Sequence, residues 1–455
     1  MSNENRTKKK ILLIMADAHM HTIKFGPISK SLREAPLTLT TLAAMVDYSK
    51  FDIRLVDESI DDIPTDYKPD IVGISILTGT AYRGYKIAKY FREQGIPVVL
   101  GGPHVTVLPD EAKEHADSIV IGMAESSWAV VLEDFLAGDL QARYDDDDKS
   151  KSTILRVPQP RVDLQRRSGY TVPNTVQATR GCKHRCDFCS VTALYSKVYQ
   201  RPIGDIIRDI KAQKGSRLVF NDVSLVDDVE YAKELFTALK PLKKTWGGLA
   251  TIEVAQNDEL LDIMRDSGCQ YLLIGFESFN QKSLKKIGKG FNKIKFYKEA
   301  MENLHARDIS IQGTMVFGFD DDDTDVFKET VERAEELRID IPRYSIYTPY
   351  PGTSLYKRLE KEKRIISKSW EDYDTMHVVY QPLGMSVDEL YDGFKWSYKE
   401  SFQVRNIMKR LELKPNFNSV INLVGNMTYK LFIHRLYNDP RFALPNGYVD
   451  ERPVI

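Results

Sequence analysis

The stretch RGCKHRCDFCS, residues 180–190, holds three of the four cysteines in a chain of 455 residues. Cys182, Cys186 and Cys189 follow a CxxxCxxC spacing. A disulfide would leave one of the three unpaired. Zinc normally takes four ligands, and His184, the nearest further candidate, sits between two of the cysteines. Three thiolates can instead bind three irons of a [4Fe–4S] cube and leave the fourth iron open. A structural zinc site stays the alternative.

The fourth cysteine and the overall composition indicate which metal ligands, partners and cellular location to expect. Cys269 stands alone in an apolar stretch, where we expect a small buried filler. The 64 basic and 65 acidic residues nearly cancel, which gives no reason to expect a nucleic-acid partner. No apolar run approaches the roughly 20 residues of a membrane span, and the first apolar run is too short for a signal peptide. We therefore expect a cytoplasmic protein without a transmembrane segment, as the low cysteine content also indicates.

The segment around the cysteines resembles the radical SAM superfamily. Phe188 precedes the last cysteine, as that family prefers, and the apolar stretch TVPNTVQAT before the motif predicts a strand. A loop and a helical pattern follow the motif. The resemblance implies that Cys182, Cys186 and Cys189 hold a [4Fe–4S] cluster whose open iron chelates S-adenosylmethionine (SAM). Reductive cleavage of SAM would then give a 5′-deoxyadenosyl radical.

The pattern after the cysteines predicts alternating strands and helices. Short apolar runs alternate with longer amphipathic ones, which indicates parallel βα units. The predicted strands after the cysteine loop lie at 217–225, 246–255, 269–278 and 309–320, and residues 341–356 predict a last strand with the loop that follows it. With the strand before the loop they make six units, matching the partial (β/α)6 barrel that the resemblance implies for residues 169–356.

Polar residues and glycines at the predicted strand ends are candidates for SAM contact, because a barrel presents its site at the carboxyl ends of its strands. They are Asp222, Glu253, Glu277, Ser278 and Gly318. The alternative role is capping of the following helix. We favour cofactor contact for Asp222 and Glu277, and leave both roles open for Glu253 and Ser278.

The first 145 residues predict a different α/β domain, a doubly wound (Rossmann-like) parallel sheet with its loops at the strand carboxyl ends. The order of ISILTGT, VVLGGPHVT and VIGMAES resembles the cobalamin-binding domain that precedes many radical SAM enzymes. The resemblance implies cofactor contacts by Ser75, Thr78, Gly101, Gly102, His104, Gly122 and Glu125. The related cobalt-ligand motif Asp-x-His-x-x-Gly is incomplete at Asp17–His19, so we expect no histidine ligand from that loop.

Two further segments complete the chain. Residues 146–168 predict a charged and then proline-rich linker, and residues 357–455 a helical extension. Aromatic residues recur at helical spacing in this extension: Tyr391, Phe394, Trp396, Tyr398 and Phe402. We expect them to face the core, a lid over an apolar substrate being the alternative. The stretch YDTMHVVYQP resembles a cobalamin-dependent radical SAM subfamily that includes hopanoid methylases.

The resemblance implies a cobalamin-dependent radical SAM enzyme, and we expect a methyltransferase that acts on an unactivated carbon of a small or lipid-like substrate. A strongly reducing flavodoxin- or ferredoxin-type donor would supply electrons. One alternative is a cobalamin-containing cyclase or rearrangement enzyme without methyl transfer. A second is a non-catalytic iron–sulfur or cobalamin sensor, which would need a partner-binding module that the sequence does not offer.

Overall fold

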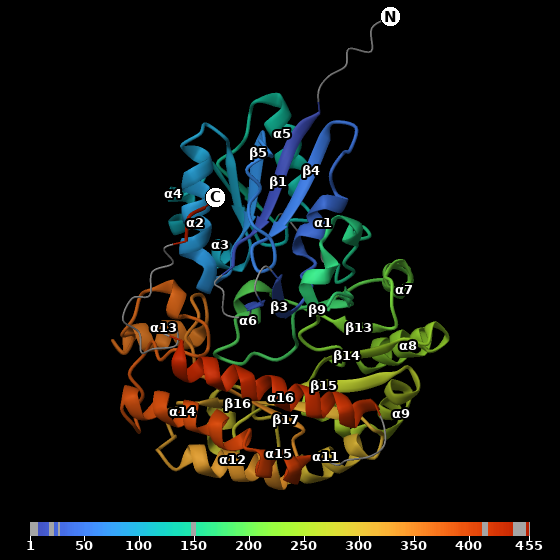
Figure 1. Cartoon of the computed structure of the whole chain (residues 1–455), viewed down its shortest axis with the longest axis vertical. Coiled ribbons are helices and arrows are strands. Elements are labelled where there is room, and N and C mark those ends of the chain that lie inside the picture. The colour runs from blue at the N-terminus through green and yellow to red at the C-terminus, as the bar shows by residue number, and fades with distance from the viewer. Residues whose placement is uncertain are drawn as a thin grey trace, which may run out of the picture. The chain divides into compact units, whose positions relative to one another are not determined.

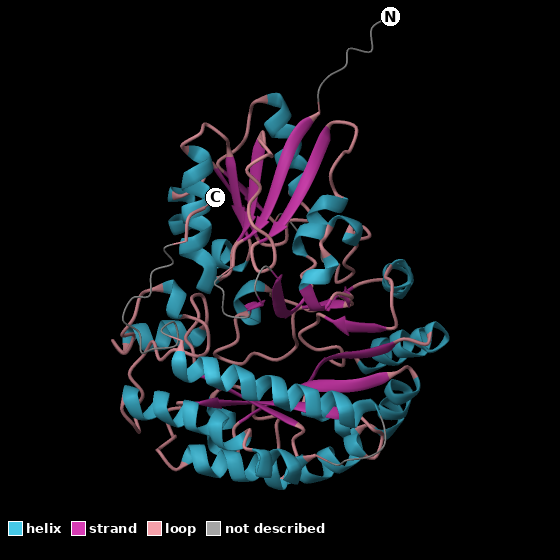
Figure 2. Ribbon diagram, in the orientation of Figure 1, coloured by secondary structure: helices cyan, strands magenta, loops and turns pink. Residues whose placement is uncertain are grey.

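The computed structural model describes residues 8–17, 22–25, 28–146, 152–411, 417–439 and 452–454. The chain forms two compact units. Unit 1 comprises Met1–Val176, Gly204–Gly215 and Val449–Ile455, and unit 2 comprises Gln177–Ile203 and Ser216–Tyr448. Both units are of the α/β class that the sequence predicts (Figure 2).

Unit 1 is built on a parallel six-stranded sheet with the order β4-β1-β5-β6-β7-β8. Figure 1 labels β4, β1 and β5 of this sheet. Its strands are β1 (Lys9–Met15), β4 (Phe51–Asp57), β5 (Ile71–Ser75), β6 (Val98–Gly101), β7 (Ser118–Ile121) and β8 (Arg143–Asp145). Its helices are α1 (Thr38–Ala44), α2 (Ala81–Arg92), α3 (Pro103–Val107), α4 (Pro109–Glu114), α5 (Trp128–Ala137) and most of α7 (Ile203–Ala212). The chain passes from one side of β1 to the other, so the ligand-binding switch point lies at the carboxyl ends of β1 and β5.

The core of unit 1 follows from apolar strands that are buried on both faces. Ile11, Leu13, Ile71 and Val99 lie in one cluster with the buried ring of Trp128 on α5. Near-continuous burial of this kind is typical of a parallel sheet covered by helices. A smaller sheet joins β2 (Thr22–Phe25), β3 (Ile28–Glu34) and β9 (Tyr170–Val172).

Unit 2 contains five parallel strands in chain order. They are β13 (Arg217–Phe220), β14 (Thr245–Ala250), β15 (Cys269–Glu277), β16 (Ser310–Phe317) and β17 (Ile341–Ile346). The connecting helices are α8 (Val229–Leu239), α9 (Asp258–Asp266), α10 (Gln281–Lys286), α11 (Tyr297–His305) and α12 (Val326–Glu336). Each strand is thus followed by a helix, as expected for consecutive βα units.

Three predicted elements differ from the structure. The strand expected over TVPNTVQAT is broken into β9, β10 (Thr175–Val176) and β11 (Thr179–Arg180), with Pro173, which has no N–H to donate, at the first break. The strand expected over 246–255 ends at Ala250 and continues as the 3₁₀ helix η5 (Ile252–Gln256). Buried apolar residues in a turn look like strand residues in the sequence, which explains this error. The helical stretch expected after 278 is interrupted between α10 and α11, where Gly288 adopts a φ of +76°.

The C-terminal region is helical as predicted. It comprises α13 (Ser354–Lys361), α14 (Val387–Ser401), α15 (Val404–Arg410) and α16 (Phe417–Asn438). Of the five aromatic residues, Tyr391, Phe394, Tyr398 and Phe402 are buried, which confirms a core-facing role, whereas Trp396 is 39% exposed. Tyr398 donates its hydroxyl to the backbone oxygen of Tyr344 on β17 at 2.9 Å. Within the described ranges, no helix has the length and apolar character needed to cross a membrane.

Candidate functional site

The three clustered cysteines lie on the loop between β11 and α6 (Val191–Leu194). All are free thiols; Cys186 is buried, and Cys182 and Cys189 are partly buried. The loop turns tightly, because the Cys189 amide donates to the Cys186 oxygen at 3.2 Å. Burial raises the pKa of Cys182 to about 12 and that of Cys186 to about 11. The thiols are therefore protonated without metal, and metal binding would release their protons.

Asp187 anchors this loop from inside. Its carboxylate accepts the Tyr347 hydroxyl at 2.8 and 2.7 Å. Its backbone amide donates to the Ile287 oxygen at 3.0 Å, and its own oxygen accepts the Leu355 amide at 3.0 Å. Burial raises the pKa of Asp187, and the Tyr347 hydrogen bond opposes that rise. Three segments distant in sequence thus fix one residue between two of the cysteines.

His184 and Glu253 lie on another side of the loop. The His184 ring stacks on Phe291 with centroids 3.6 Å apart, and its Nε2 lies 3.4 Å from a Glu253 carboxylate oxygen. Glu253 was expected at the end of a strand, but η5 carries it to this position. Burial lowers the pKa of His184. The structure therefore brings Glu253 beside the cysteine loop by a route that the sequence did not indicate.

The cysteine set fits a group that takes three protein ligands. Cys269 begins β15 and Glu277 ends it. Glu277 pairs with Lys289, and the neighbouring Gly288 packs against Arg185 and Cys186, so the cysteine loop lies near the Glu277 end. A nine-residue strand spans roughly 25–30 Å, so Cys269 is too far away to be a fourth ligand. Its burial agrees with the predicted filler role. In the described part of the chain, no three His, Cys, Asp or Glu side chains are arranged to hold a single metal ion.

Glu277 ends β15, and Ser278 and Gly318 directly follow β15 and β16, as predicted. Glu277 is buried, and one of its carboxylate oxygens lies 2.5 Å from Lys289 Nζ, a partner that the sequence analysis missed. The Ser278 hydroxyl accepts the Asn280 amide at 3.0 Å, a local turn contact. The Gly318 amide donates to the Asp322 carboxylate at 3.0 Å. Their contacts with SAM stay predictions.

Asp222 is already engaged by its own chain. Its carboxylate accepts the backbone amides of Ala178 and Thr179 and, at 2.8 Å, the Thr179 hydroxyl. The residue is buried, and burial raises its pKa to about 6. These contacts favour a structural role, in which Asp222 holds the chain that leads into the cysteine loop; SAM contact would have to share the same oxygens.

The candidate cobalamin residues lie on three loops at the carboxyl ends of β5, β6 and β7, beside the switch point. They are Ser75 and Thr78, then Gly101, Gly102 and His104, then Gly122 and Glu125. Hydrogen bonds join the loops: Thr106 donates to the Gly102 oxygen and accepts the Gly122 amide, both at 3.0 Å. Gly122 is exposed and Gly101 and Gly102 are partly exposed, so a large cofactor could approach the backbone. This edge of unit 1 therefore fits cobalamin.

His104 is placed differently from the expectation. It is fully buried; Nδ1 lies 3.4 Å from the Thr78 hydroxyl, and Nε2 lies 3.1 Å from the Tyr85 hydroxyl and 3.3 Å from a Glu111 carboxylate oxygen. Both ring nitrogens thus face the chain's own groups. We favour a structural histidine that supports the cofactor-side loops. His19, for which no cobalt ligation was expected, lies outside the described residues.

An ion pair and the C-terminal residues, neither predicted, also occupy this edge. Arg83 and Glu58 form a salt bridge of 2.6 Å with both side chains 5% exposed. Arg83 and Lys86 donate to the Arg452 backbone oxygen, and Arg452 donates to the Asp17 oxygen at 2.6 Å. Contacts between residues so distant in sequence give no local signal, which is why the sequence pattern predicted neither the Arg83 pairing of Glu58 nor the contacts of Arg452.

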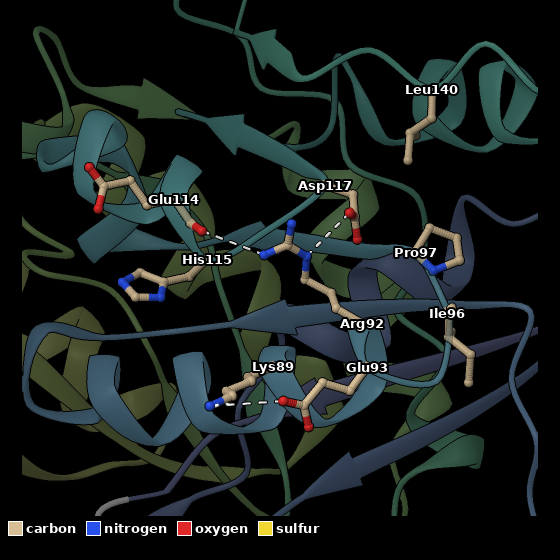
Figure 3. A pocket seen from close by; sticks show the side chains of 10 residues that line it. Lys89, Arg92, Glu93, Ile96, Pro97, Glu114, His115, Asp117 and Leu140 are labelled. Atoms are coloured by element: carbon tan, nitrogen blue, oxygen red, sulfur yellow. Dashed lines mark hydrogen bonds and ion pairs between the residues drawn. The ribbon is translucent and has the colours of Figure 1, made fainter.

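A hollow of about 700 Å³ lies elsewhere on unit 1 (Figure 3). Arg92 and Asp117, 3.2 Å apart, and Lys89 and Glu93 form ion pairs in its wall. Pro97 precedes β6 and Asp117 precedes β7, so the hollow is at the amino ends of these strands. It is therefore separate from the predicted cofactor loops.

Three stretches of the chain match known families. Residues 9–132 match the B12 binding domain, residues 176–334 the radical SAM superfamily, and residues 353–417 a domain of unknown function (DUF4070).

Individual relatives extend these matches. The bacteriochlorophyllide d C-12(1)-methyltransferase of Chlorobaculum tepidum is 30% identical over 445 residues, covering 95% of this chain and 96% of the relative. The hopanoid C-2 methylase of Rhodopseudomonas palustris is 23% identical over 348 residues, covering 73% and 65%. The solved structure of TsrM, a radical S-adenosylmethionine methyltransferase from Kitasatospora setae, matches with a TM-score of 0.64 and 14% identity, covering 94% of this chain and 99% of that one. This last likeness concerns the fold.

Proposed function

Because this chain belongs to the cobalamin-dependent radical SAM methyltransferase family, we propose that it methylates an unactivated carbon of an apolar substrate through a 5′-deoxyadenosyl radical. Family membership confirms the predicted cofactors: a [4Fe–4S] cluster, SAM and cobalamin. The observation that carries the proposal is the end-to-end match to a C-methyltransferase, in a chain whose three free cysteines share one anchored loop. Radical chemistry is the step that an unactivated carbon requires.

Different residues of the chain would bind the cluster and the cobalamin. When bound, the cluster supplies the electron that cleaves SAM, and cobalamin supplies the methyl group. Cys182, Cys186 and Cys189 would hold the cluster, while Asp187 and Tyr347 keep their loop in one conformation. The joined loops of unit 1 would hold cobalamin. We also propose four parts of the chain: a cobalamin-binding domain (1–145), a linker (146–168), a radical SAM barrel (169–356) and a helical C-terminal region (357–455).

An apolar substrate has two supports. The relatives named above act, by their names, on a bacteriochlorophyllide and a hopanoid, both large ring systems. In addition, α16 exposes apolar side chains at spacings of three and four residues, which places them on one face: Val420, Leu423, Val424, Met427 and Leu431. An exposed apolar face of this kind marks a surface that binds another protein, a membrane or an apolar ligand. We infer a tetrapyrrole-like or lipid-like substrate.

The proposed chemistry also implies a supply of electrons. Cleaving a sulfonium through an iron–sulfur cluster needs a strongly reducing one-electron donor, so we infer a flavodoxin- or ferredoxin-type partner. Such a partner and the free cysteines are consistent with a cytoplasmic location.

The test is an anaerobic assay of the full chain reconstituted with iron, sulfide and hydroxocobalamin. Dithionite and SAM with a deuterated methyl group are added to bacteriochlorophyllide d or to a hopanoid, and products are measured by mass spectrometry. Labelled methyl in the substrate together with 5′-deoxyadenosine is the expected result. 5′-Deoxyadenosine with an altered but unlabelled product would replace the proposal with the cyclase alternative. Bound cofactors without SAM cleavage would favour the sensor.

A further inference from the structure

A buried ion pair lies beside the cysteine loop. Lys289 Nζ is 2.5 Å from Glu277 Oε1, and the two side chains are 11% and 9% exposed. Gly275 leaves the space for this pair, because a methyl group there would lie 2.2 Å from Glu277 Oε1 and 2.5 Å from Lys289 Nζ. Glu277 itself has a φ of 62°, in the left-handed region that few non-glycine residues adopt. The local backbone is thus shaped around the pair.

The turn that carries Lys289 touches the cysteine loop directly. The oxygen of Ile287 accepts the Asp187 amide at 3.0 Å. A methyl group on Gly288 would lie 2.8 Å from the Arg185 oxygen and 3.5 Å from the Cys186 Cα. The residues immediately before Lys289 therefore pack against the backbone on both sides of Cys186.

Lys289 is the residue directly after Gly288, so its buried side chain belongs to the turn that packs on Cys186. Burial disfavours the Lys289 ammonium, but Glu277 opposes this effect and the pKa of Lys289 is raised. The turn thus carries a buried cation, paired with the buried Glu277 anion, beside the cysteine loop.

Reduction of a cluster held by three thiolates adds one electron to a group that is already anionic. A buried cation stabilises the more negative, reduced form more than the oxidised form, and the effect is large where water is excluded. The potentials of protein-bound clusters respond to nearby charge in this way. Glu277 is an anion and has the opposite influence.

We propose that Lys289 sets the reduction potential of the cluster in this site, raising it so that the electron needed for SAM cleavage can be loaded, with Glu277 as the opposing charge. Lys289 acts through the cluster and takes no part in bond making. The proposal rests on the proposed function, because it requires the cluster.

The test is a redox titration of the anaerobically reconstituted full chain without SAM, followed by electron paramagnetic resonance of the reduced cluster. Lys289→Met should move the midpoint potential to more negative values by at least 59 mV, a tenfold change in the reduction equilibrium. Glu277→Gln should move the midpoint potential in the positive direction. Lys289→Arg keeps the positive charge and should keep the wild-type potential. The exposed Lys293→Met is the matched control and should leave it unchanged.

Iron and sulfide content is measured first, so that two failures can be told apart. A wild-type chain that binds no cluster would overturn the proposed function. A fully loaded Lys289→Met variant with an unchanged potential would overturn the role of Lys289. If Lys289→Met does not retain its cluster, Glu277→Gln decides: a positive shift supports the proposal and no shift, or a negative one, refutes it. A purely structural pair would not shift the potential in opposite directions.

Discussion

Removing one hydroxyl group, in Tyr347→Phe, should loosen the cysteine loop without disturbing the surrounding core. The Tyr347 ring packs edge-on against Phe188, Phe319 and Tyr380, and phenylalanine keeps these contacts. The hydrogen bonds to the Asp187 carboxylate, at 2.8 and 2.7 Å, are lost. The variant thus removes the hydroxyl that anchors Asp187 and keeps the aromatic packing.

The expected magnitude follows from the burial of Asp187. A hydrogen bond to a charged group contributes about 1.5–3 kcal/mol. Since each 1.4 kcal/mol corresponds to about a factor of ten, local opening of the loop should become about ten to a hundred times more frequent. The Asp187 amide donates to the Ile287 oxygen and the Leu355 amide donates to the Asp187 oxygen, so exchange at these two amides reports the opening directly.

Hydrogen–deuterium exchange with mass spectrometry, on the metal-free chain, measures this opening in peptides that cover residues 181–190 and 355. Tyr398→Phe is the matched control, because it also removes a buried hydroxyl, which bonds to Tyr344 on β17. It should accelerate exchange on β17 and α14 and leave the cysteine loop unchanged. If Tyr347→Phe leaves exchange in 181–190 as slow as in the wild type, Asp187 does not anchor the loop.

Three further predictions concern the same unit. Gly288→Ala forces a left-handed φ on a residue with a Cβ and should lower the iron bound after reconstitution, whereas Gly290→Ala should not; equal iron in both would contradict the packing argument. Burial raises the pKa of Asp322 to about 7, so its contribution to the free energy of unfolding is present below about pH 4 and is lost as the pH rises to 7. The loss is about 4 kcal/mol at most. Asp322→Asn should flatten the pH dependence of the unfolding free energy, and an unchanged profile would refute this. Cys269→Ala should keep full cluster content while Cys186→Ala loses it, as iron analysis would show, and cluster loss in Cys269→Ala would reopen the question of a fourth ligand.

Local patterns were sufficient to predict most of the architecture. Alternating short apolar runs and amphipathic helices predict the βα order of both units, because the hydrophobic pattern of each segment reflects which of its faces is buried. The CxxxCxxC spacing is also local, since one short loop carries all three ligands. Errors arose where burial did not imply a strand, as for Ile252 and Val254 in η5, which are buried in a turn.

The partners of the candidate residues could not be predicted, because they depend on long-range contacts. Asp222 bonds to amides 43 and 44 residues away, and His104 to Thr78 across 26 residues. Lys289 is one lysine among many in KKIGKGFNKIK, and only the fold brings it to Glu277. The sequence therefore located the site at the strand ends but not the contacts that decide which residues remain available to a cofactor.

The most direct test of the central claim is a count of cofactors and of SAM cleavage on one preparation. The anaerobically reconstituted full chain is analysed for iron, sulfide and corrin, and 5′-deoxyadenosine is measured after addition of dithionite and SAM. We expect four irons and one corrin per chain, with 5′-deoxyadenosine formed by the wild type and absent in Cys186→Ala. A chain that forms 5′-deoxyadenosine without retaining corrin, or a Cys186→Ala variant that still cleaves SAM, would contradict the account.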